Sequence, residues 1–499
     1  MRRAVFVLLV PCMGAFASPV KNCGDLAAMS FGPEVKIESA KLISATPRMP
    51  EHCDIGGVIW PENHFAVKLP TNWNERFQMV GNGGWAGVIS LPQVDAAVRA
   101  GYASTSTDTG HDEKKEPGAS FAYPGPNNPN AERKVVDFGY LAVHETALLA
   151  KKMIQAYYGA DPKYSYWVGC STGGREGLME AQRYPEDFDG YVVGAPVLDL
   201  AGLQAKSVYN YQIAGQGPAE ITREKAALLT KQYLDKCDAS DGVKDGVVEN
   251  PLKCGFDPEK DLTRCSGETD GAGCFTGPQI EALKKIYAGV HDSQGNLLFP
   301  GMPAGGNGGV AQGFNLSKSF MEFMAFDPPA GPNWDYRTFN VDTDWPRLTA
   351  IRLRIDATIT DLSAVKARGG KILQYHGWSD PGVSPEMSIN YYQAVKSKLG
   401  SKETDDFYRL FLVPGMGHCQ GGAAACSNVD WLGAMVNWLE KGVAPTALVG
   451  SHLEQGQTTR TRPICAYPNQ AQYKGSGSID DVANFACSGA SEQALRASQ

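Results

Sequence analysis

The sequence predicts an α/β protein whose strands form a mostly parallel sheet with helices packed against it. Short apolar, strand-like runs alternate with longer runs in which apolar residues recur at helical spacing. One strand-like run, 164–168, leads into a glycine-rich turn that a helix-compatible run follows, and the same rhythm resumes at 371–375 after a long interruption. Strands that alternate with helices in this way are typical of a parallel sheet.

The turn at 169–173 reads Gly-Cys-Ser-Thr-Gly, a Gly-x-Ser-x-Gly pattern between a strand and a helix. In this setting the backbone turns sharply and lifts the serine oxygen clear of the sheet, and the small residues let strand and helix approach closely. The pattern therefore marks Ser171 as a candidate nucleophile. The alternative is a Gly/Ser-rich turn without chemistry.

The N-terminal segment 1–17 reads as a signal peptide. Arg2 and Arg3 precede an apolar run at 4–10, and Ala15-Phe-Ala17 is a small-residue cleavage site that places the mature start near Ser18. The apolar run is too short to span a bilayer. A lipoprotein signal through Cys12 is less favourable because Pro11 precedes it. We expect a secreted or periplasmic protein that does not use a membrane as its partner.

The net charge is −8, and it becomes −10 without Arg2 and Arg3. An acidic exported chain is a poor candidate for nucleic-acid binding, so we expect a small-molecule substrate instead. The sequence leaves open whether the protein is a monomer or a homodimer.

The first half of the chain contains the early strands and the first helix. Their expected ranges are 58–60, 64–69, 76–80, 102–107, 164–168 and 191–193 for strands, and 135–158 for the helix. A glycine cluster, Gly81-Asn-Gly-Gly-Trp85, directly follows one of these strands. α/β-Hydrolases place one oxyanion donor there, so we expect the backbone N–H of Thr172 to act together with that of Gly83 or Gly84. A plain turn is the alternative.

The strand rhythm is lost from about residue 198 to 356. This stretch is rich in Gly and Pro, holds four cysteines and has amphipathic pieces at 223–233 and 278–287. We interpret 198–356 as an inserted, disulfide-stapled lid domain, and 18–197 with 357–499 as the catalytic domain. In the latter we expect strands at 371–375 and 407–413, a helix capped by Ser384 with Pro385 in its first turn, and a closing helix at 429–440.

A serine nucleophile needs a histidine base and an acid that orients it, and α/β-hydrolases present them in the order Ser, acid, His. Asp380 follows a strand on a Pro/Gly-bounded loop, and His418 follows the next strand in a Gly-rich loop. We therefore assign Asp380 and His418 to these roles. The competing acids and histidines in the same half of the chain fit less well: Asp356, Asp405, Asp406, His291, His376 and His452.

Eleven cysteines remain after the leader is removed, which in an oxidising compartment suggests five bridges and one free thiol. Neighbours along the chain suggest Cys23–Cys53, Cys237–Cys254, Cys265–Cys274 and Cys465–Cys487. If Ser171 meets His418, then Cys170 and Cys419 come within disulfide reach. Cys426 is then unpaired, although Cys170–Cys426 stays a possible alternative.

A second candidate site lies in the loop between Cys237 and Cys254. Asp238, Asp241 and Asp245 crowd this loop, and a hard divalent cation relieves the repulsion among three carboxylates. Calcium suits carboxylates that alternate with the backbone carbonyls of Val243 and Val247. We expect a structural Ca²⁺ there; the alternative is an acidic, solvated turn. No other cofactor is expected.

These motifs together resemble the tannase/feruloyl esterase family, whose mark is a Cys-Ser…Asp…His-Cys arrangement. Here it reads Cys170-Ser171, Asp380 and His418-Cys419. The resemblance implies an α/β-hydrolase core, a disulfide between these two cysteines, and a lid that binds calcium at the five positions named above. It also implies hydrolysis of aromatic-acid esters, such as feruloyl esters of plant cell walls, galloyl esters of tannins or mono(2-hydroxyethyl) terephthalate.

We expect feruloyl or hydroxycinnamoyl esters, free or attached to plant polysaccharide, as substrates. The stretch 314–339 is rich in aromatic residues that suit a planar ring or simply form the core of the lid, and Arg337 would meet a substrate carboxylate or pair with an acidic neighbour. Two rival functions are a catalytically silent, ligand-binding relative and a serine peptidase on the same fold.

Overall fold

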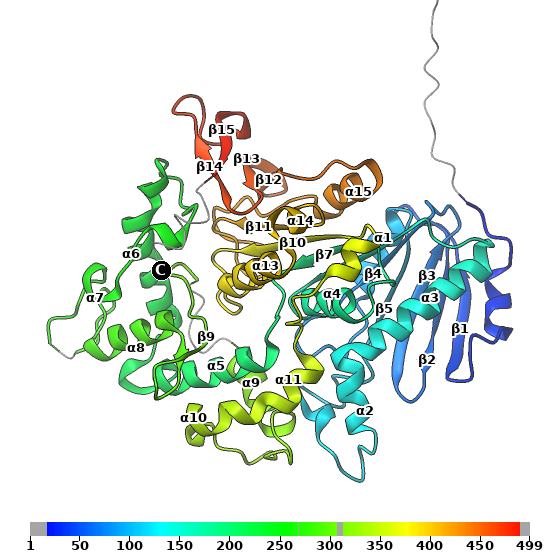
Figure 1. Ribbon diagram of the computed structural model, residues 1–499, viewed down its shortest axis with the longest axis horizontal. Coiled ribbons are helices and arrows are strands. Elements are labelled where there is room, and N and C mark those ends of the chain that lie inside the picture. Colours follow the sequence, from blue (N-terminus) through cyan, green and yellow to red (C-terminus); the bar gives the residue numbers. More distant parts are fainter. Residues whose placement is uncertain (1–16, 268, 307–312, 490–499) are drawn as a thin grey trace, which may run out of the picture.

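A nine-stranded sheet forms the centre of the protein in the computed structural model, which describes residues 17–267, 269–306 and 313–489 (Figure 1). The predicted signal peptide lies outside the described residues except for Ala17. In spatial order the strands are β1 (Val35–Ile43), β2 (His52–Ile59), β3 (Asn63–Pro70), β5 (Ala103–Thr107), β4 (Arg76–Val80), β6 (Tyr164–Cys170), β7 (Gly190–Gly194), β10 (Lys371–Gly377) and β11 (Tyr408–Val413).

The sheet is mixed but mostly parallel, as the sequence predicts. All neighbours from β5 to β11 pair in parallel, whereas β1, β2 and β3 form an antiparallel meander, and β3 joins β5 antiparallel. β1 is not expected from the sequence, and only the end of β2 is, because these strands carry many polar and half-exposed residues. The carboxyl ends of the parallel strands meet at one edge, where the candidate site lies.

Helices cover both faces of the sheet. Because successive side chains of a strand point to opposite faces, each strand contributes to two apolar cores, one on each face. Trp167 of β6 belongs to one core with side chains of α3 (Ala142–Tyr158), α4 (Thr172–Arg183) and α13 (Pro385–Leu399). Its neighbour Tyr166 belongs to the other core, with side chains of α1 (Leu91–Arg99) and α15 (Trp431–Lys441). Ser384 caps α13 and Pro385 begins it, as predicted.

The helix predicted at 135–158 is not continuous. It divides into α2 (Ala131–Val136), one π-helical turn at Asp137–Leu141, and α3. Arg175, fully buried in α4, donates to the carbonyls of Phe138, Gly139 and Ile355, so it binds backbone oxygens at this π turn and at the end of α11 (Thr349–Ile355). A π turn of this kind has no periodicity signal in the sequence.

Between β7 and β10 the chain leaves the sheet and forms a mainly helical body beside it (Figure 1). Part of this body has its own apolar core, which includes Leu229, Phe275 and Leu283. Besides α11, its elements are α5 (Leu200–Ala214), α6 (Arg223–Cys237), α7 (Pro258–Asp261), α8 (Gly277–Ala288), β8 (Val290–His291), β9 (Leu297–Phe299), α9 (Phe314–Phe323) and α10 (Val341–Asp344). Two short helices flank β10 and β11 in the sequence: α12 (Ser363–Ala367) and α14 (Ser401–Asp405).

After α15 the chain forms two antiparallel hairpins that the sequence analysis does not predict. They are β12 (Ala447–Glu454) with β13 (Gln457–Cys465), and β14 (Asn469–Tyr473) with β15 (Phe485–Gly489). Phe485 and Ala471 pack with Val243, so this C-terminal part rests on the acidic loop 237–254.

Five disulfides join the chain: Cys23–Cys53, Cys170–Cys419, Cys237–Cys254, Cys265–Cys274 and Cys465–Cys487. These are the pairs that the spacing and the proposed triad suggest. Cys426 is free and buried, and burial raises the pKa of its thiol to about 11, which makes it unreactive at neutral pH. Five bridges are consistent with an extracellular protein. Among the described residues, no helix is long and apolar enough to cross a membrane.

Candidate active site

Ser171 lies on a strained turn between β6 and α4. Its φ is +64° and its ψ is −122°, a conformation that non-glycine residues rarely adopt. Two backbone bonds hold the turn: Ser171 N–H donates to Gly194 O (2.9 Å), and Gly173 N–H donates to Asn82 O (2.8 Å). A Cβ on Gly169 would lie 2.5 Å from Gly173 O, so only glycine lets the strand pass the helix this closely.

Asp380 follows β10 and is completely buried. Its carboxylate accepts four N–H groups: Oδ1 accepts from the backbone of Gly382 and Val383 (2.9 Å each), and Oδ2 accepts from His418 (2.6 Å) and His376 (3.2 Å). Burial by itself would raise the pKa of Asp380, but the hydrogen bonds from the two histidines outweigh it and hold the pKa well below its ordinary value. Asp380 is therefore ionised at every pH at which the protein would work.

His418 follows β11 in a loop fixed to the elbow by a disulfide. Because an ionised Asp380 can only accept, His418 Nδ1 carries the proton and Nε2 is left as the free base. The Cys170–Cys419 bridge, with 5.9 Å between the two Cα atoms, joins the residue before Ser171 to the residue after His418. No hydrogen bond joins Ser171 to His418 among the described residues; such bonds commonly tighten only when substrate is bound.

Ser171 and His418 line one cavity of about 250 Å³ at the carboxyl edge of the sheet. The wall is predominantly apolar, and α5 and α9 supply much of it. The cavity is lined by Gly84, Trp85, Ser171, Thr172, Val197, Leu200, Leu203, Gln204, Ser207, Gly313, Leu316, Ser317, Pro381, Gly382, Val383 and His418. Its size and apolar lining suit a small organic substrate.

Two of the three expected oxyanion donors lie at this cavity. Thr172 is the first residue of α4, where backbone N–H groups have no acceptor within the helix. Gly84 lies across from it, held by a 2.6 Å bond from the Thr172 hydroxyl to Gly84 O, and its positive φ of 57° suits glycine. Gly83 is exposed and does not line the cavity.

His376 has a role that the sequence analysis does not recognise. It is fully buried on β10, and its Nε2 lies 3.2 Å from Asp380 Oδ2 and 3.0 Å from Val383 O. Both partners are acceptors, so Nε2 carries the proton, and Nδ1 accepts from Ser388 Oγ (2.7 Å). His376 thus helps to fix Asp380 through Oδ2, the same oxygen that His418 contacts. The only sequence signal is its position four residues before Asp380.

A buried carboxyl lies behind the elbow. Glu176 accepts from Asn82 N–H (3.0 Å), the residue that also receives the Gly173 bond. Burial raises its pKa to about 7, against the opposing effect of Arg175. Glu176 therefore links the glycine cluster at 81–84 to α4.

The aromatic stretch 314–339 does not supply the wall of this cavity. None of Phe320, Phe323, Phe326, Trp334, Tyr336 and Phe339 lines it; three of them are buried in the core, and α9 presents Leu316 and Ser317 to the cavity instead. Of the two roles expected for these rings, the structure therefore favours the core of the lid over a wall of the Ser171 cavity. Arg337 pairs with Asp335 at 2.8 Å on the surface, which is the simpler of its two expected roles.

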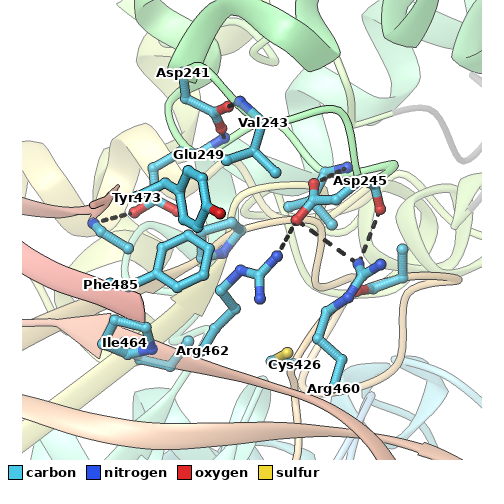
Figure 2. Close-up of a pocket in the computed structure, with 15 residues that line it drawn as sticks. Asp241, Val243, Asp245, Glu249, Cys426, Arg460, Arg462, Ile464, Tyr473 and Phe485 are labelled. Atoms are coloured by element: carbon cyan, nitrogen blue, oxygen red, sulfur yellow. Dashed lines mark hydrogen bonds and ion pairs between the residues drawn. The ribbon is translucent and has the colours of Figure 1, made fainter. Parts of the chain in front are cut away.

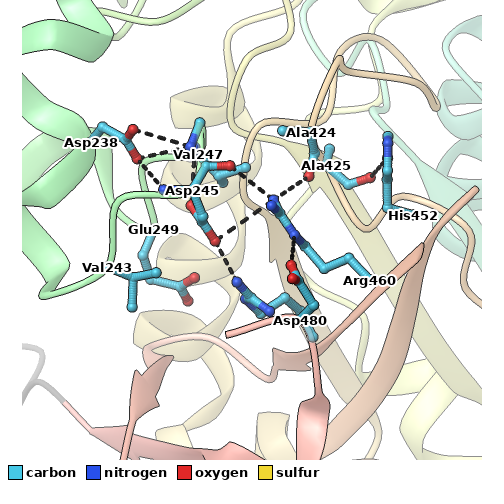
Figure 3. A network of polar contacts seen from close by, with 12 residues as sticks. Asp238, Val243, Asp245, Val247, Glu249, Ala424, Ala425, His452, Arg460 and Asp480 are labelled. Carbon is cyan, nitrogen blue, oxygen red and sulfur yellow. Dashed lines mark hydrogen bonds and ion pairs between the residues drawn. The ribbon is translucent and has the colours of Figure 1, made fainter. Parts of the chain in front are cut away.

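The acidic loop 237–254 lies against the C-terminal hairpins and lines a separate, small cavity together with them (Figure 2). Asp245 is ion-paired with Arg462 and Arg460, and Asp238 accepts from the backbone of Asp245 and Gly246 (Figure 3). Asp241 accepts from Val243 N–H (2.9 Å). The two arginines, from the unpredicted β13, offset part of the negative charge that the sequence places here.

The donor set of this loop suits a hard cation in two respects. Burial, with the charges of Asp245 and Asp238, raises the pKa of Asp241, so the carboxylates repel one another without a cation. The carbonyl oxygens of Val243 and Val247 accept no hydrogen bond within the described chain. However, the three carboxylates do not converge to within 4.8 Å of one another.

Another group in the described residues does converge: His144, Glu180 and Asp187 have ligand atoms within 4.8 Å of one another. This buried His/Glu/Asp group could bind a metal. His144 Nδ1 lies 2.6 Å from Asp187 Oδ2, and both Glu180 oxygens lack a partner. Burial and Asp187 raise the pKa of Glu180 well above its ordinary value, so a proton on Glu180 balances the group equally well.

Comparison with known proteins gives a consistent result. The family model described as tannase and feruloyl esterase matches residues 49–488. An uncharacterised esterase of Xanthomonas campestris pv. campestris is 33% identical over 94% of this chain and 92% of that protein. A probable feruloyl esterase B-1 of Aspergillus flavus is 32% identical over 84% of this chain and 82% of that protein.

Two solved structures resemble the whole fold. Feruloyl esterase B from Aspergillus oryzae superposes with a TM-score of 0.85 at 27% identity, covering 93% of this chain and 99% of that one. Tannin acyl hydrolase from Aspergillus niger superposes with a TM-score of 0.74 at 22% identity, covering 94% of each chain, which shows a shared fold alone.

Proposed function

Because the chain belongs to the tannase and feruloyl esterase family and is a carboxylic ester hydrolase, we propose that it cleaves esters of aromatic acids, specifically feruloyl and related hydroxycinnamoyl esters, through an acyl-enzyme on Ser171. The single observation that carries the proposal is the 2.6 Å bond from His418 Nδ1–H to Asp380 beside a cavity that also contains Ser171. With the proton on Nδ1, His418 Nε2 is free to act as the base.

In the proposed reaction His418 Nε2 takes the Ser171 proton while Oγ attacks the ester carbonyl. Asp380 keeps the imidazole in the required tautomer and stabilises its cation. The Thr172 and Gly84 N–H groups bind the oxyanion of the tetrahedral intermediate, which then expels the alcohol, protonated by His418. Water deprotonated by His418 attacks the acyl-enzyme, and the aromatic acid leaves.

We further propose that the loop 237–254 holds a structural Ca²⁺ with Asp238, Asp241 and Asp245 and the carbonyls of Val243 and Val247. The free carbonyls and the mutual repulsion at Asp241 support this site. The ion would supply only positive charge that fixes the loop against β13–β15. The segment 198–356, which contributes α5 and α9 to the cavity wall, would act as the lid, and the leader 1–17 would direct export.

A substrate panel tests the function. Methyl ferulate, methyl caffeate, methyl gallate, chlorogenate and mono(2-hydroxyethyl) terephthalate are compared by kcat/KM, with Ser171→Ala as the control. We expect the hydroxycinnamates to be the best substrates and Ser171→Ala to be inactive on all. Preference for gallate or the terephthalate would reassign the substrate within the family, and hydrolysis of peptides rather than esters would overturn the proposal.

A further inference from the structure

A buried lysine lies beside the candidate active site without a direct ion-pair contact among the described residues. Lys206 of α5 is 4% exposed, and within the part of the chain that the structure describes its ammonium has no hydrogen-bond or ion-pair partner. An isolated buried ammonium is costly, and such groups are normally paired. Burial lowers the pKa of Lys206 to about 8, with the charge of Asp380 opposing this shift, so the side chain is still mostly charged at pH 7.

Asp380 cannot serve as the hydrogen-bonding partner. Its two oxygens already accept four N–H groups, from Gly382, Val383, His376 and His418, which fills the acceptor sites of a carboxylate. The three N–H donors of the Lys206 ammonium are therefore free to bind a ligand.

Lys206 lines a second, small cavity that adjoins the Ser171 cavity. The two cavities share a wall made of Ser207, Pro381 and Gly382. The second cavity is further lined by Asn210 and Tyr287, and the Tyr287 hydroxyl is buried without a partner. Lys206, Ser207, Asn210 and Tyr287 thus bring four hydrogen-bonding side chains into one small space with a net positive charge.

We propose that this second cavity is an anion subsite that binds a carboxylate carried by the substrate, with Lys206 as its counter-ion. The inference rests on the proposed function, because the ester that Ser171 attacks must occupy the adjoining cavity if the carboxylate belongs to the same molecule. The carboxylate can belong to the alcohol part or to the acyl part of the ester. The subsite would favour esters that carry a second, free acid group over their uncharged analogues.

Two matched substrate pairs test this and distinguish the two sources. Chlorogenate and its methyl ester share the caffeoyl group and the quinate ring and differ only in the free carboxylate on the alcohol part. Mono- and bis(2-hydroxyethyl) terephthalate differ in a carboxylate on the acyl part. We expect Lys206→Met, which keeps the volume, to raise KM for the charged member of one pair by roughly 30-fold or more and to leave its uncharged partner within about twofold. Lys206→Arg should retain part of the preference.

The matched control is Lys231→Met, which removes an exposed lysine of α6 and should change neither pair. Equal losses for charged and uncharged esters in Lys206→Met would overturn the inference, since Lys206 would then act through Asp380. Binding of uncleaved chlorogenate and mono(2-hydroxyethyl) terephthalate to Ser171→Ala, measured by calorimetry with and without Lys206→Met, does not need turnover. If Lys206→Met leaves the Kd of both charged esters unchanged, the subsite is refuted. If the wild type hydrolyses none of the esters, the proposed function is refuted.

Discussion

At the scale of single residues, the site is organised around the Asp380 carboxylate. Two histidines and two backbone N–H groups bind it, although it is completely buried. Four donors to one carboxylate keep it ionised and hold its orientation toward His418. Removing its charge or one of its donors therefore changes the chemistry without removing the cavity.

Asp380→Asn is expected to lower kcat on methyl ferulate by about 10⁴-fold, because an amide cannot hold His418 in the proposed tautomer and stabilise its cation. Steady-state kinetics measure this, with circular dichroism to verify the fold. A loss smaller than tenfold would remove Asp380 from the proposed triad.

His376→Asn is expected to lower kcat by roughly ten- to a hundredfold while KM stays unchanged, because His376 bonds to Asp380 but does not line the cavity. Ser388→Ala, which removes only the partner of His376 Nδ1, should have a smaller effect in the same direction. A change in KM instead of kcat would contradict this positioning role.

The buried carboxyl of Glu176 should make the stability of the protein depend on pH. Its pKa is about 7 in the folded protein, above the ordinary 4.5, so the folded state retains a proton that the unfolded state loses. Its contribution therefore favours folding below about pH 4.5 and becomes increasingly unfavourable as pH rises toward 7, by up to about 3 kcal/mol. Thermal melting of Glu176→Gln should show a smaller loss of stability between pH 5 and pH 8 than the wild type. Parallel curves for the two proteins would be inconsistent with a buried, protonated Glu176.

At the scale of elements, the sequence predicts the strand–turn–helix unit around Ser171 because that unit is local: an apolar strand, the glycines and the helix are consecutive. The loops that hold Asp380 and His418 follow for the same reason. The wall of the cavity does not follow, since α5 and α9 combine Leu203, Gln204 and Leu316 from positions more than a hundred residues apart. The hairpins β12–β15 also escape sequence reasoning, because their polar, half-exposed strands give a weak alternation signal.

The Cys170–Cys419 bridge ties the nucleophile elbow to the His418 loop across 249 residues of sequence. Replacing both cysteines by alanine should lower the free energy of unfolding by up to about 5 kcal/mol and also lower kcat, because the two loops lose their covalent link. The control is the double variant Cys265→Ala and Cys274→Ala. It removes a disulfide that spans only nine residues of sequence in the helical body, so kcat should stay unchanged. Denaturant unfolding and ester kinetics measure the two effects, and equal kcat in both double variants would contradict a role for the bridge in the site.

At the scale of the whole molecule, the acidic loop, the helical body and the C-terminal hairpins meet in one place. Lys253 donates to Gln470, and Glu249 accepts from Ala471 N–H, in addition to the Asp245–arginine pairs. Sequence reasoning locates the carboxylates of this junction but misses the arginines opposite them, since these lie more than two hundred residues away. A cation in this loop would stabilise all three parts together.

Removal of calcium by a chelator is accordingly expected to lower the melting temperature by several degrees. A free Ca²⁺ concentration of a hundred times the Kd would add about 2.7 kcal/mol to the free energy of unfolding. Asp241→Asn should melt at a lower temperature than the wild type and respond less to the chelator. Calorimetry with and without added Ca²⁺ measures both. An unchanged wild-type melting temperature after prolonged chelation would count against the site.

The proposed esterase activity requires Ser171 to be an activated nucleophile, and covalent labelling with a fluorophosphonate serine probe tests this most directly. Intact-mass spectrometry should show one adduct on the wild type, located at Ser171 by peptide mapping and formed in parallel with loss of methyl ferulate hydrolysis. Ser171→Ala should gain no mass. An unlabelled wild type, or an adduct of equal yield on Ser171→Ala, would contradict the account.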